Sequence, residues 1–384
     1  VYIPVTTNNP IISSGIIAVK HIWVDGAEAN LLVNSGATLK VSTDFGDGVL
    51  GAQNGGLITN RGTINVTNTY GIAAGYRAVF IASNSTLVNY GTLNISYPQN
   101  YATTITGTLT NKNGGKIFIT NSLRGFSVNP GGTIVNESNA TIKIDTSNAA
   151  IFSTGILNNS GVIEGIGQIE NYTPGQIINN TCGIITLKGN YWNNVSSTTT
   201  NTGFFQISDG LNAGGTFTNN GVLKYGKLSG VVINNQNNSI IVKNATMPIF
   251  TYGGTYDGII HGIFIDSLAT ISAGTFILPN TFTPLGSLPL GSQTLYTKVT
   301  PSGGGCTYIV PFTYINCSAN ATINYLDSNY CKSVTAVEVN LLGTKGGNFS
   351  STSGLNINST TGEINPSNSL SGKYKITYKL TGVG

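Results

Sequence analysis

The sequence is poor in charged residues, which make up only 8% of its 384 positions, against about a quarter in an average soluble domain. Its 18 Lys and Arg and 14 Asp and Glu give a net charge of +4 at pH 7, and the basic residues form no run. Because nucleic-acid-binding surfaces need clustered Lys and Arg, we expect no nucleic-acid partner.

Long apolar runs are missing too. No stretch reaches the roughly 20 apolar residues that span a bilayer, so no membrane-spanning segment is predicted. The sequence from Val1 does not read as a basic and apolar leader, and we therefore expect a mature or trimmed product. Apolar residues still reach 40%, with 18 Tyr and 14 Phe, which is enough to build a long core.

What the sequence has in abundance is a repeated phrase of apolar residues, an Asn, a short turn that usually holds Gly, and an apolar strand, as in ITNRGTINV and LVNYGTLNI. The Asn residues that lead the phrases are Asn34, Asn60, Asn89, Asn111, Asn136, Asn158, Asn179, Asn219 and Asn234. Most steps between them are roughly 21 to 29 residues, a period typical of stacked repeats. Asn194 lies within the longer step from Asn179 to Asn219.

This period favours coils of three short strands, in which each strand pairs with its equivalent one coil away. Asn tolerates the left-handed backbone region and can bond to an Asn of the next coil, so the leading Asn is interpreted as a corner residue. We predict an all-β chain with a right-handed parallel β-helix over residues 25–250, preceded by an N-terminal strand or cap segment at 1–24. The alternative is an antiparallel sandwich with Asn-Gly hairpins.

The four cysteines are unevenly placed, with Cys182 alone in the repeat region and the other three near the C-terminal end. Cys306 and Cys317 bracket a short loop, and a disulfide between them would indicate an oxidising, extracellular setting. Cys182 is interpreted as a buried, unreactive thiol. Since no Cys pair has zinc-ligand spacing and only His21 and His261 could join one, no metal or cofactor is expected.

Asn-x-Ser/Thr triplets are frequent, and one interpretation is glycosylation of a secreted surface protein. The candidate acceptors are Asn65, Asn84, Asn94, Asn171, Asn194, Asn244 and Asn320. The alternative is that a chain this rich in Asn, Ser and Thr produces such triplets by chance.

The Asn phrase stops after about residue 250. Residues 251–316 keep short β-like runs but gain five Pro, which favours a β-rich capping or connecting region. Residues 317–384 form a third segment with the motifs YLDSNYC, GGNFSS, GLNIN, TGEINP and GKYKITY.

These motifs resemble the immunoglobulin-like repeat of large surface proteins of Bacteroidota, including gliding-motility adhesins. The matching positions are Tyr325, Tyr330, Cys331, Gly347, Phe349, Gly354, Leu355, Ile357, Thr361, Gly362, Ile364, Pro366, Gly372, Tyr374, Thr377 and Tyr378. The resemblance implies a small immunoglobulin-like β-sandwich and an extracellular or cell-surface location, reached by the type IX secretion route. In that family another repeat usually follows, so either the protein continues beyond residue 384 or Cys331 lacks its usual partner. The repeat region resembles the β-helices of adhesins in architecture only.

Carboxylates that could support catalysis on a β-helix are dispersed along the chain. Asp44 with Asp47 and Glu164 with Glu170 are the best local pairs, and a surface role is the simpler interpretation of each. Nucleophile motifs and phosphate-binding loops are missing. We therefore predict that the chain is not an enzyme, and a polysaccharide lyase or hydrolase is the least favoured hypothesis.

The leading hypothesis is a structural subunit of an extracellular filament or surface fibre. The alternative is a stalk, or a carbohydrate- or cell-contact module, of a large surface adhesin. In that alternative Tyr76, Tyr90, Tyr172, Tyr191 or Trp192 would stack on the sugar rings of surface glycans.

Head-to-tail assembly is predicted because a β-helix must cover the unpaired edges of its terminal coils. The residues assigned to this contact are Val1, Tyr2, Ile3, Val5, Ile11 and Ile12 near one end and Tyr374, Ile376 and Tyr378 in the closing strand near the other. Pairing between these segments of two subunits would produce a homopolymer.

Overall fold

A computed structural model describes residues 1–6, 9–43, 49–68, 77–96, 101–229, 233–235, 240–243, 259–277, 281–285, 288, 291–300, 306–316, 321–343 and 347–379. The chain divides into two compact units, of which the first comprises residues 1–283 with 294–313 and the second residues 284–293 with 314–384. The described elements are strands apart from one short 3-10 helix, η1 (Pro366–Asn368). No helix among the described residues is long and apolar enough to cross a membrane.

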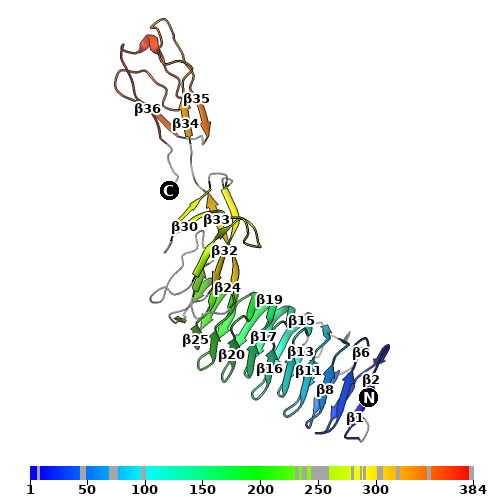
Figure 1. Ribbon diagram of the computed structural model, residues 1–384. Helices are drawn as coiled ribbons and strands as arrows, with labels where there is room; N and C mark the ends of the chain where they lie inside the picture. Colours follow the sequence, from blue (N-terminus) through cyan, green and yellow to red (C-terminus); the bar gives the residue numbers. More distant parts are fainter. Residues whose placement is uncertain are drawn as a thin grey trace. The chain divides into compact units, whose positions relative to one another are not determined.

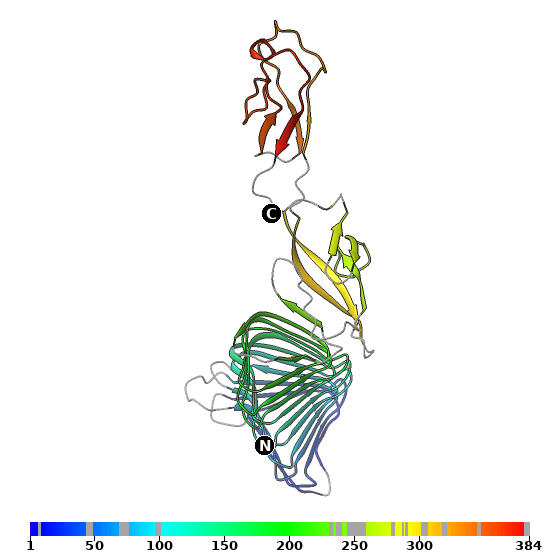
Figure 2. The ribbon, with the colours of Figure 1, turned by 90° about the vertical axis from the view of Figure 1, so that its left-hand side faces the viewer.

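The first unit contains a parallel β-solenoid of about nine turns (Figure 1). Its smaller sheet has 11 strands, which pair in chain order: β2 (Ile11–Ile12), β5 (Asn30–Val33), β8 (Leu57–Asn60), β11 (Thr86–Asn89), β14 (Thr108–Asn111), β16 (Thr133–Asn136), β18 (Ile156–Asn159), β20 (Gln176–Asn179), β23 (Thr198–Asn201), β25 (Thr216–Asn219) and β27 (Ile233–Asn235). Figure 2 looks nearly along this stack, so that strands of successive coils superpose.

The larger sheet has 17 strands and forms the other sides of each coil. They are β1 (Tyr2–Pro4), β3 (Ile16–Val19), β4 (Ile22–Asp25), β6 (Thr38–Thr43), β7 (Leu50–Gln53), β9 (Thr63–Asn68), β10 (Arg77–Ile81), β12 (Thr92–Ser96), β13 (Tyr101–Ile105), β15 (Lys116–Val128), β17 (Thr141–Ser153), β19 (Val162–Asn171), β21 (Ile184–Lys188), β22 (Tyr191–Asn193), β24 (Phe204–Ala213), β26 (Val222–Ser229) and β28 (Ile240–Lys243). In the middle coils two sides merge into one long strand, as in β15 and β17.

The predicted parallel β-helix is therefore confirmed, and the antiparallel hairpin alternative is wrong, because the solenoid ladders described are parallel. Residue 25 is not where the solenoid begins. Strand β1 already pairs in parallel with β4, and Ile3 lies beside Val24 in this ladder. The N-terminal segment is the first coil rather than a separate cap. The right-handed sense of the coil stays a prediction.

Columns of apolar side chains fill the solenoid, because alternate residues of each strand point inward and equal register stacks them. One column runs through Leu31, Ile58, Leu87, Leu109, Ile134, Leu157 and Ile177. Its members are fully buried. The next coil places Thr199 in this column, and the following one Phe217.

Buried asparagines form a second column two residues further along each strand. The Nδ2 of each donates to the Oδ1 of the next at 2.7–2.9 Å, through Asn60, Asn89, Asn111, Asn136, Asn159, Asn179, Asn201 and Asn219. The sequence-based register was wrong at three places. Asn159 rather than Asn158 occupies the column, Val33 rather than Asn34 pairs with Asn60, and Asn235 rather than Asn234 pairs with Asn219. Asn201 was missed because its phrase carries Thr in place of apolar residues.

The Gly that follows most of the ladder asparagines is explained by the close approach of neighbouring coils. A Cβ atom on Gly91 would lie 2.1 Å from the carbonyl oxygen of Gly62, and one on Gly203 would lie 2.2 Å from that of Gly183. The ladder asparagines do not themselves take positive φ. That conformation occurs at other turn residues, such as Asn84 with φ of 64°, so the predicted corner role belongs to different asparagines.

The small Thr199 leaves room in the core that an aromatic cluster fills. The ring centroids of Tyr191, Phe205 and Phe217 lie 5.5–5.9 Å apart. The Tyr191 hydroxyl is hydrogen-bonded to Thr199 and donates to Asn193 Oδ1. Tyr191 is fully buried, and its burial raises the pKa of the phenol well above its usual range.

A small sheet of β29 (Ile259–Phe264), β32 (Gly291–Thr300) and β33 (Tyr308–Asn316) follows the coils, and β29 and β32 pair in antiparallel. Strands β30 (Gly274–Ile277) and β31 (Thr281–Pro284) form a separate two-stranded sheet. Tyr308 stacks on Phe204 of the solenoid at 5.7 Å and joins a buried cluster with Val222, Val299 and Val310. Phe204 in β24 and Val222 in β26 occupy the outward strand position that Thr63 and Thr92 occupy in β9 and β12. The position is apolar in β24 and β26, where β33 covers it.

Cys182 and Cys306 form a disulfide that joins the solenoid to the segment before β33 across 124 residues. The predicted Cys306–Cys317 pair is therefore wrong, and Cys182 is not a buried thiol. The preference for a short loop failed because the chain returns to lie against the coil that holds Cys182, 124 residues earlier in the sequence. Of the cysteines in the described ranges, Cys331 carries a free, exposed thiol.

The second unit contains two antiparallel strand pairs, β34 (Ala321–Asn324) with β35 (Asn340–Gly343) and β36 (Asn348–Ser351) with β37 (Ile376–Lys379). Phe349 and Tyr378 pack with ring centroids 4.5 Å apart. Gly362 takes φ of 75°, and a Cβ atom there would lie 2.7 Å from the Phe349 ring. The unit is thus all-β, and several motif residues contact one another within it.

Candidate functional site

An outward face of the solenoid carries a groove across four neighbouring coils, on β10, β13, β15 and β17. Parallel register places Arg77 beside Tyr101 and Tyr101 beside Arg124. Adjacent strands are about 4.8 Å apart, so these three side chains form one row along the solenoid axis.

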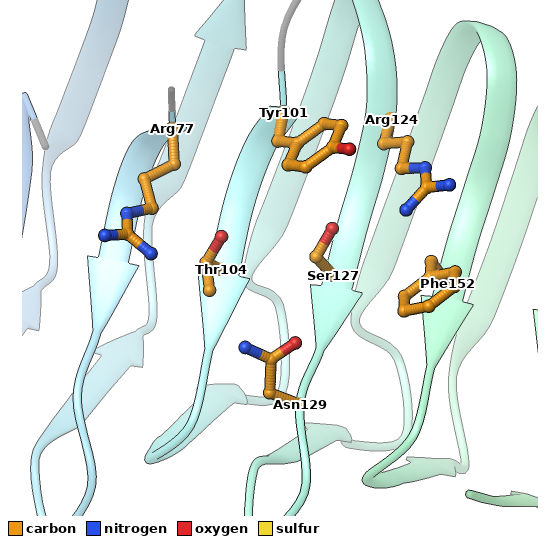
Figure 3. Close-up of a pocket in the computed structure, with 7 residues that line it drawn as sticks. All are labelled: Arg77, Tyr101, Thr104, Arg124, Ser127, Asn129 and Phe152. Atoms are coloured by element: carbon orange, nitrogen blue, oxygen red, sulfur yellow. The ribbon is translucent and has the colours of Figure 1, made fainter. Parts of the chain in front are cut away.

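A second row lies three residues further along the same strands and includes Thr104, Ser127 and Phe152. Together with Asn129 and the first row these residues line a depression of about 190 Å³. Figure 3 shows Thr104, Ser127 and Phe152 on successive strands, with Tyr101 and Arg124 above them and Arg77 at one end.

Both arginines of the groove lie over aromatic rings. The guanidinium carbon of Arg77 is 4.4 Å from the Phe80 centroid. That of Arg124 is 4.5 Å from the Phe152 centroid and 5.1 Å from that of Tyr101. Such stacking holds a planar cation in a defined orientation through cation–π attraction.

A polar network continues the second row on the far side of Phe152. Glu170, which pairs with Phe152 in register, is buried and lies 3.8 Å from Arg124. Gln168 donates to Glu170 Oε1 at 2.8 Å and accepts from the Trp192 indole N–H at 3.3 Å. This network fixes Glu170 away from solvent, so the carboxylate is engaged within the protein.

The five aromatic residues predicted to stack on sugars lie in different environments. Trp192 and Tyr172 are exposed near the groove side of the coils, whereas Tyr90 is exposed in a turn under Arg61. Tyr191 is a core residue, so its assignment as an exposed contact was wrong. Tyr76 lies outside the described residues.

The predicted assembly residues of the first coil are mostly exposed. Tyr2 and Ile11 have 61% and 59% exposed surface, while Ile3 is buried in the core. In the second unit the Tyr378 hydroxyl accepts from the Gly347 N–H at 2.8 Å and Ile376 pairs with Ser351 in the β36–β37 ladder. Tyr374 donates to the Leu370 carbonyl.

The candidate glycosylation residues also divide by burial. Asn84 and Asn194 are exposed, and Asn65 and Asn94 are half-buried and hydrogen-bonded to each other. Asn171 is fully buried and donates to Asn193 at 2.8 Å, so this acceptor was wrongly chosen. Asn244 and Asn320 lie outside the described residues.

Of the acidic pairs considered for catalysis, Asp44 and Asp47 lie outside the described residues. Glu164 forms an exposed ion pair with Lys143 at 3.4 Å, and Glu170 is held in the network above. Within the described ranges no group of three or more His, Cys, Asp or Glu could hold a metal ion.

Sequence reasoning missed Arg77, Arg124, Thr104 and Ser127, because their proximity depends on the register of coils with unequal loops. One usable signal was present: the chain has only three arginines, and two of them are separated by about two repeat periods. Comparisons with protein-family models, with curated proteins and with solved structures find no match to this chain.

Proposed function

We propose that this chain is a structural segment of an extracellular surface fibre and performs no catalysis. The observation that carries the proposal is the ladder of eight buried asparagines, linked from coil to coil at 2.7–2.9 Å. Each coil is thereby joined to its neighbours by side-chain as well as main-chain hydrogen bonds along the solenoid axis. Stacked repeats of this kind suit an elongated, stiff element.

The disulfide supports the proposed extracellular location. Cys182–Cys306 spans 124 residues, and such bonds persist mainly in oxidising compartments. The immunoglobulin-like assignment of the second unit, and an adhesin-type surface protein of Bacteroidota as the source, rest on the motif resemblance. Packing of the motif residues Phe349, Gly362 and Tyr378 is in keeping with it.

Head-to-tail assembly is the form of fibre that the first coil supports. Strands β1, β2 and β3 pair with β4, β5 and β6 of the next coil, and Ile11 and Ile16 are 59% and 64% exposed on them. An edge strand with apolar side chains is a ready site for strand addition. The proposed partner is the second unit of another copy of this chain.

Charged substitutions on this edge test the assembly. Ile11→Lys and Ile16→Lys should convert polymers, seen by sedimentation and negative-stain electron microscopy, into monomers, because lysine on an edge strand opposes pairing. Ile166→Lys is the matched control, since Ile166 is an exposed Ile of β19 in the middle of the solenoid. Polymers that survive the edge substitutions would overturn the role of the first coil. A wild-type protein that stays monomeric and rod-shaped would favour the alternative, a stalk within a longer adhesin.

A further inference from the structure

The groove concentrates the chain's rarest cation. Arg61, Arg77 and Arg124 are its only arginines, and the other 15 basic residues are Lys. Arginine differs from lysine in presenting a planar fork of N–H donors, which matches a carboxylate through two parallel hydrogen bonds. Two of three arginines at one surface depression therefore favour recognition of a planar anion there.

The rings beneath the arginines prepare them for this role. Phe80 lies under Arg77, and Tyr101 and Phe152 flank Arg124 at 4.4–5.1 Å. A guanidinium that lies over a ring has its face occupied, while the N–H groups at its edge point away from the ring. Less side-chain freedom is then lost when the edge binds an anion.

Ser127 supplies an independent sign of a ligand. Its side chain is 5% exposed and lines the groove, and its Oγ has no hydrogen-bond partner among the described residues. Buried hydroxyl groups are nearly always paired, so an unpaired one commonly marks a site that a ligand or water completes. In Figure 3 the Ser127 hydroxyl points up toward the level of Tyr101 and Arg124, and Thr104 lies on the adjacent strand.

We propose that this groove binds a carboxylate-bearing sugar within an acidic glycan chain. Arg77 or Arg124 binds the carboxylate, Ser127, Thr104 and Asn129 bind ring hydroxyls, and the rings of Tyr101 and Phe152 contact the apolar face of the sugar. The depression of about 190 Å³ is smaller than the roughly 300–1,000 Å³ of enclosed ligand sites. It therefore suits one sugar of a chain that lies across the coils. This binding role goes beyond the structural one and does not depend on it.

Calorimetric titration with three kinds of glycan tests the proposal. Oligogalacturonate supplies uronic acids, sialyllactose supplies a terminal sialic acid, and carboxyl-reduced oligogalacturonate has the same backbone without the charge. We expect at least one acidic glycan to bind at least ten-fold more tightly than the carboxyl-reduced one. The acidic glycan that binds more tightly identifies the kind of sugar that supplies the carboxylate. Using the Ile11→Lys variant for these titrations keeps the result separate from assembly, whatever the outcome of the fibre test.

Substitutions within the groove locate the binding. Arg77→Gln and Arg124→Gln should each weaken binding about ten-fold or more, and Ser127→Ala should weaken it several-fold. Arg124→Lys keeps the charge but loses the fork, so a similar loss there would identify bidentate recognition. Arg61→Gln is the matched control, because Arg61 also lies over a tyrosine, Tyr90 at 5.3 Å, but outside the groove.

Several outcomes would overturn the proposal. These are equal binding of the charged and carboxyl-reduced glycans, equal losses in Arg61→Gln and Arg124→Gln, and no binding by the wild type. Equal affinity for single-stranded DNA would also do so, because it would indicate non-specific attraction of anions. Thermal melting of every variant separates loss of the site from loss of the fold, and Ser127→Ala provides a test that leaves both arginines in place.

Discussion

The solenoid and the second unit are both built from strands, but they bury their side chains to very different extents. In the solenoid, column after column of inward residues is fully buried, from Leu31 to Leu223. Among the described residues of the second unit, few side chains are buried, and they include Phe349 and Ile364. The solenoid thus distributes its stability over many equivalent contacts, whereas the second unit depends on a small number of individual ones.

This difference follows from repetition. A coil needs only an apolar residue at each inward position, because its neighbours above and below present the same pattern. A unit without repeats needs specific side chains to meet across unlike strands, as Phe349 and Tyr378 do. Substitutions in the two units should therefore produce separate and unequal effects.

The largest effect is expected from a charge inside the solenoid. Ile142 is fully buried and lies between Ile117 and Ile163 in one column. Ile142→Asp would bury an unpaired carboxylate, and we expect a loss of roughly 4–5 kcal/mol or more. Scanning calorimetry should show the solenoid transition lost or strongly lowered, with the transition of the second unit unchanged.

Thr141→Asp is the control for this substitution, because Thr141 is the adjacent residue of β17 and points outward. It should melt close to the wild type. A loss of both transitions in Ile142→Asp would contradict the independence of the two units.

The next effect concerns the second unit. Phe349→Ala removes the ring that packs on Tyr378 and lies beside Gly362. Truncation of a buried Phe costs about 3–5 kcal/mol, which should unfold this unit while the solenoid transition stays in place. Leu342→Ala in β35 is the control, since Leu342 is exposed, and it should leave both transitions unchanged. Equal shifts in the two transitions would show that the units unfold together.

How far the sequence predicts the molecule also differs between regions. The repeat period and the alternation of apolar residues were sufficient to predict the parallel coils, because the same pattern recurs from coil to coil. They were insufficient to choose between Asn158 and Asn159, where the phrase ILNN offers two asparagines and only the two-residue spacing from Leu157 decides. The Cys182–Cys306 bond and the Arg77–Arg124 groove depend on contacts between segments whose loops vary in length, which local patterns do not specify.

Substitutions of the two asparagines at this ambiguous register should have an intermediate effect on stability. Asn159 accepts from Asn136 and donates to Asn179, both at 2.8 Å inside the core. Asn159→Ala leaves buried amide groups unpaired and should cost about 1–3 kcal/mol. Asn158→Ala loses one half-buried hydrogen bond from Asn180, so its cost should be at most about 1 kcal/mol. Urea denaturation followed by circular dichroism measures the stability loss in both variants. A larger loss in Asn158→Ala than in Asn159→Ala would support the register that the sequence favoured, with Asn158 in the column.

The smallest effect is expected at the first coil, which has a neighbouring coil on one side only. Asp25 accepts hydrogen bonds from Tyr2, from Gln53 at 2.9 Å and from Asn54 at 2.7 Å. The bond from the Tyr2 hydroxyl, followed by those from Gln53 and Asn54, holds the pKa of Asp25 below its ordinary value. Because the folded pKa is lower than the unfolded one, these bonds stabilise β1 fully above about pH 4 and lose that contribution as pH falls through the folded pKa.

Hydrogen-exchange protection factors should therefore fall in β1 between pH 6 and pH 3, while those of the central strand β16 stay constant. Asp25→Asn removes the titrating group, so its β1 protection should be nearly independent of pH over this range. The same fall in wild type and Asp25→Asn would assign the acid sensitivity to another group. The same fall in β16 would mean that the end coil and the central coils open together, and the contrast between repeated and terminal positions would then be lost.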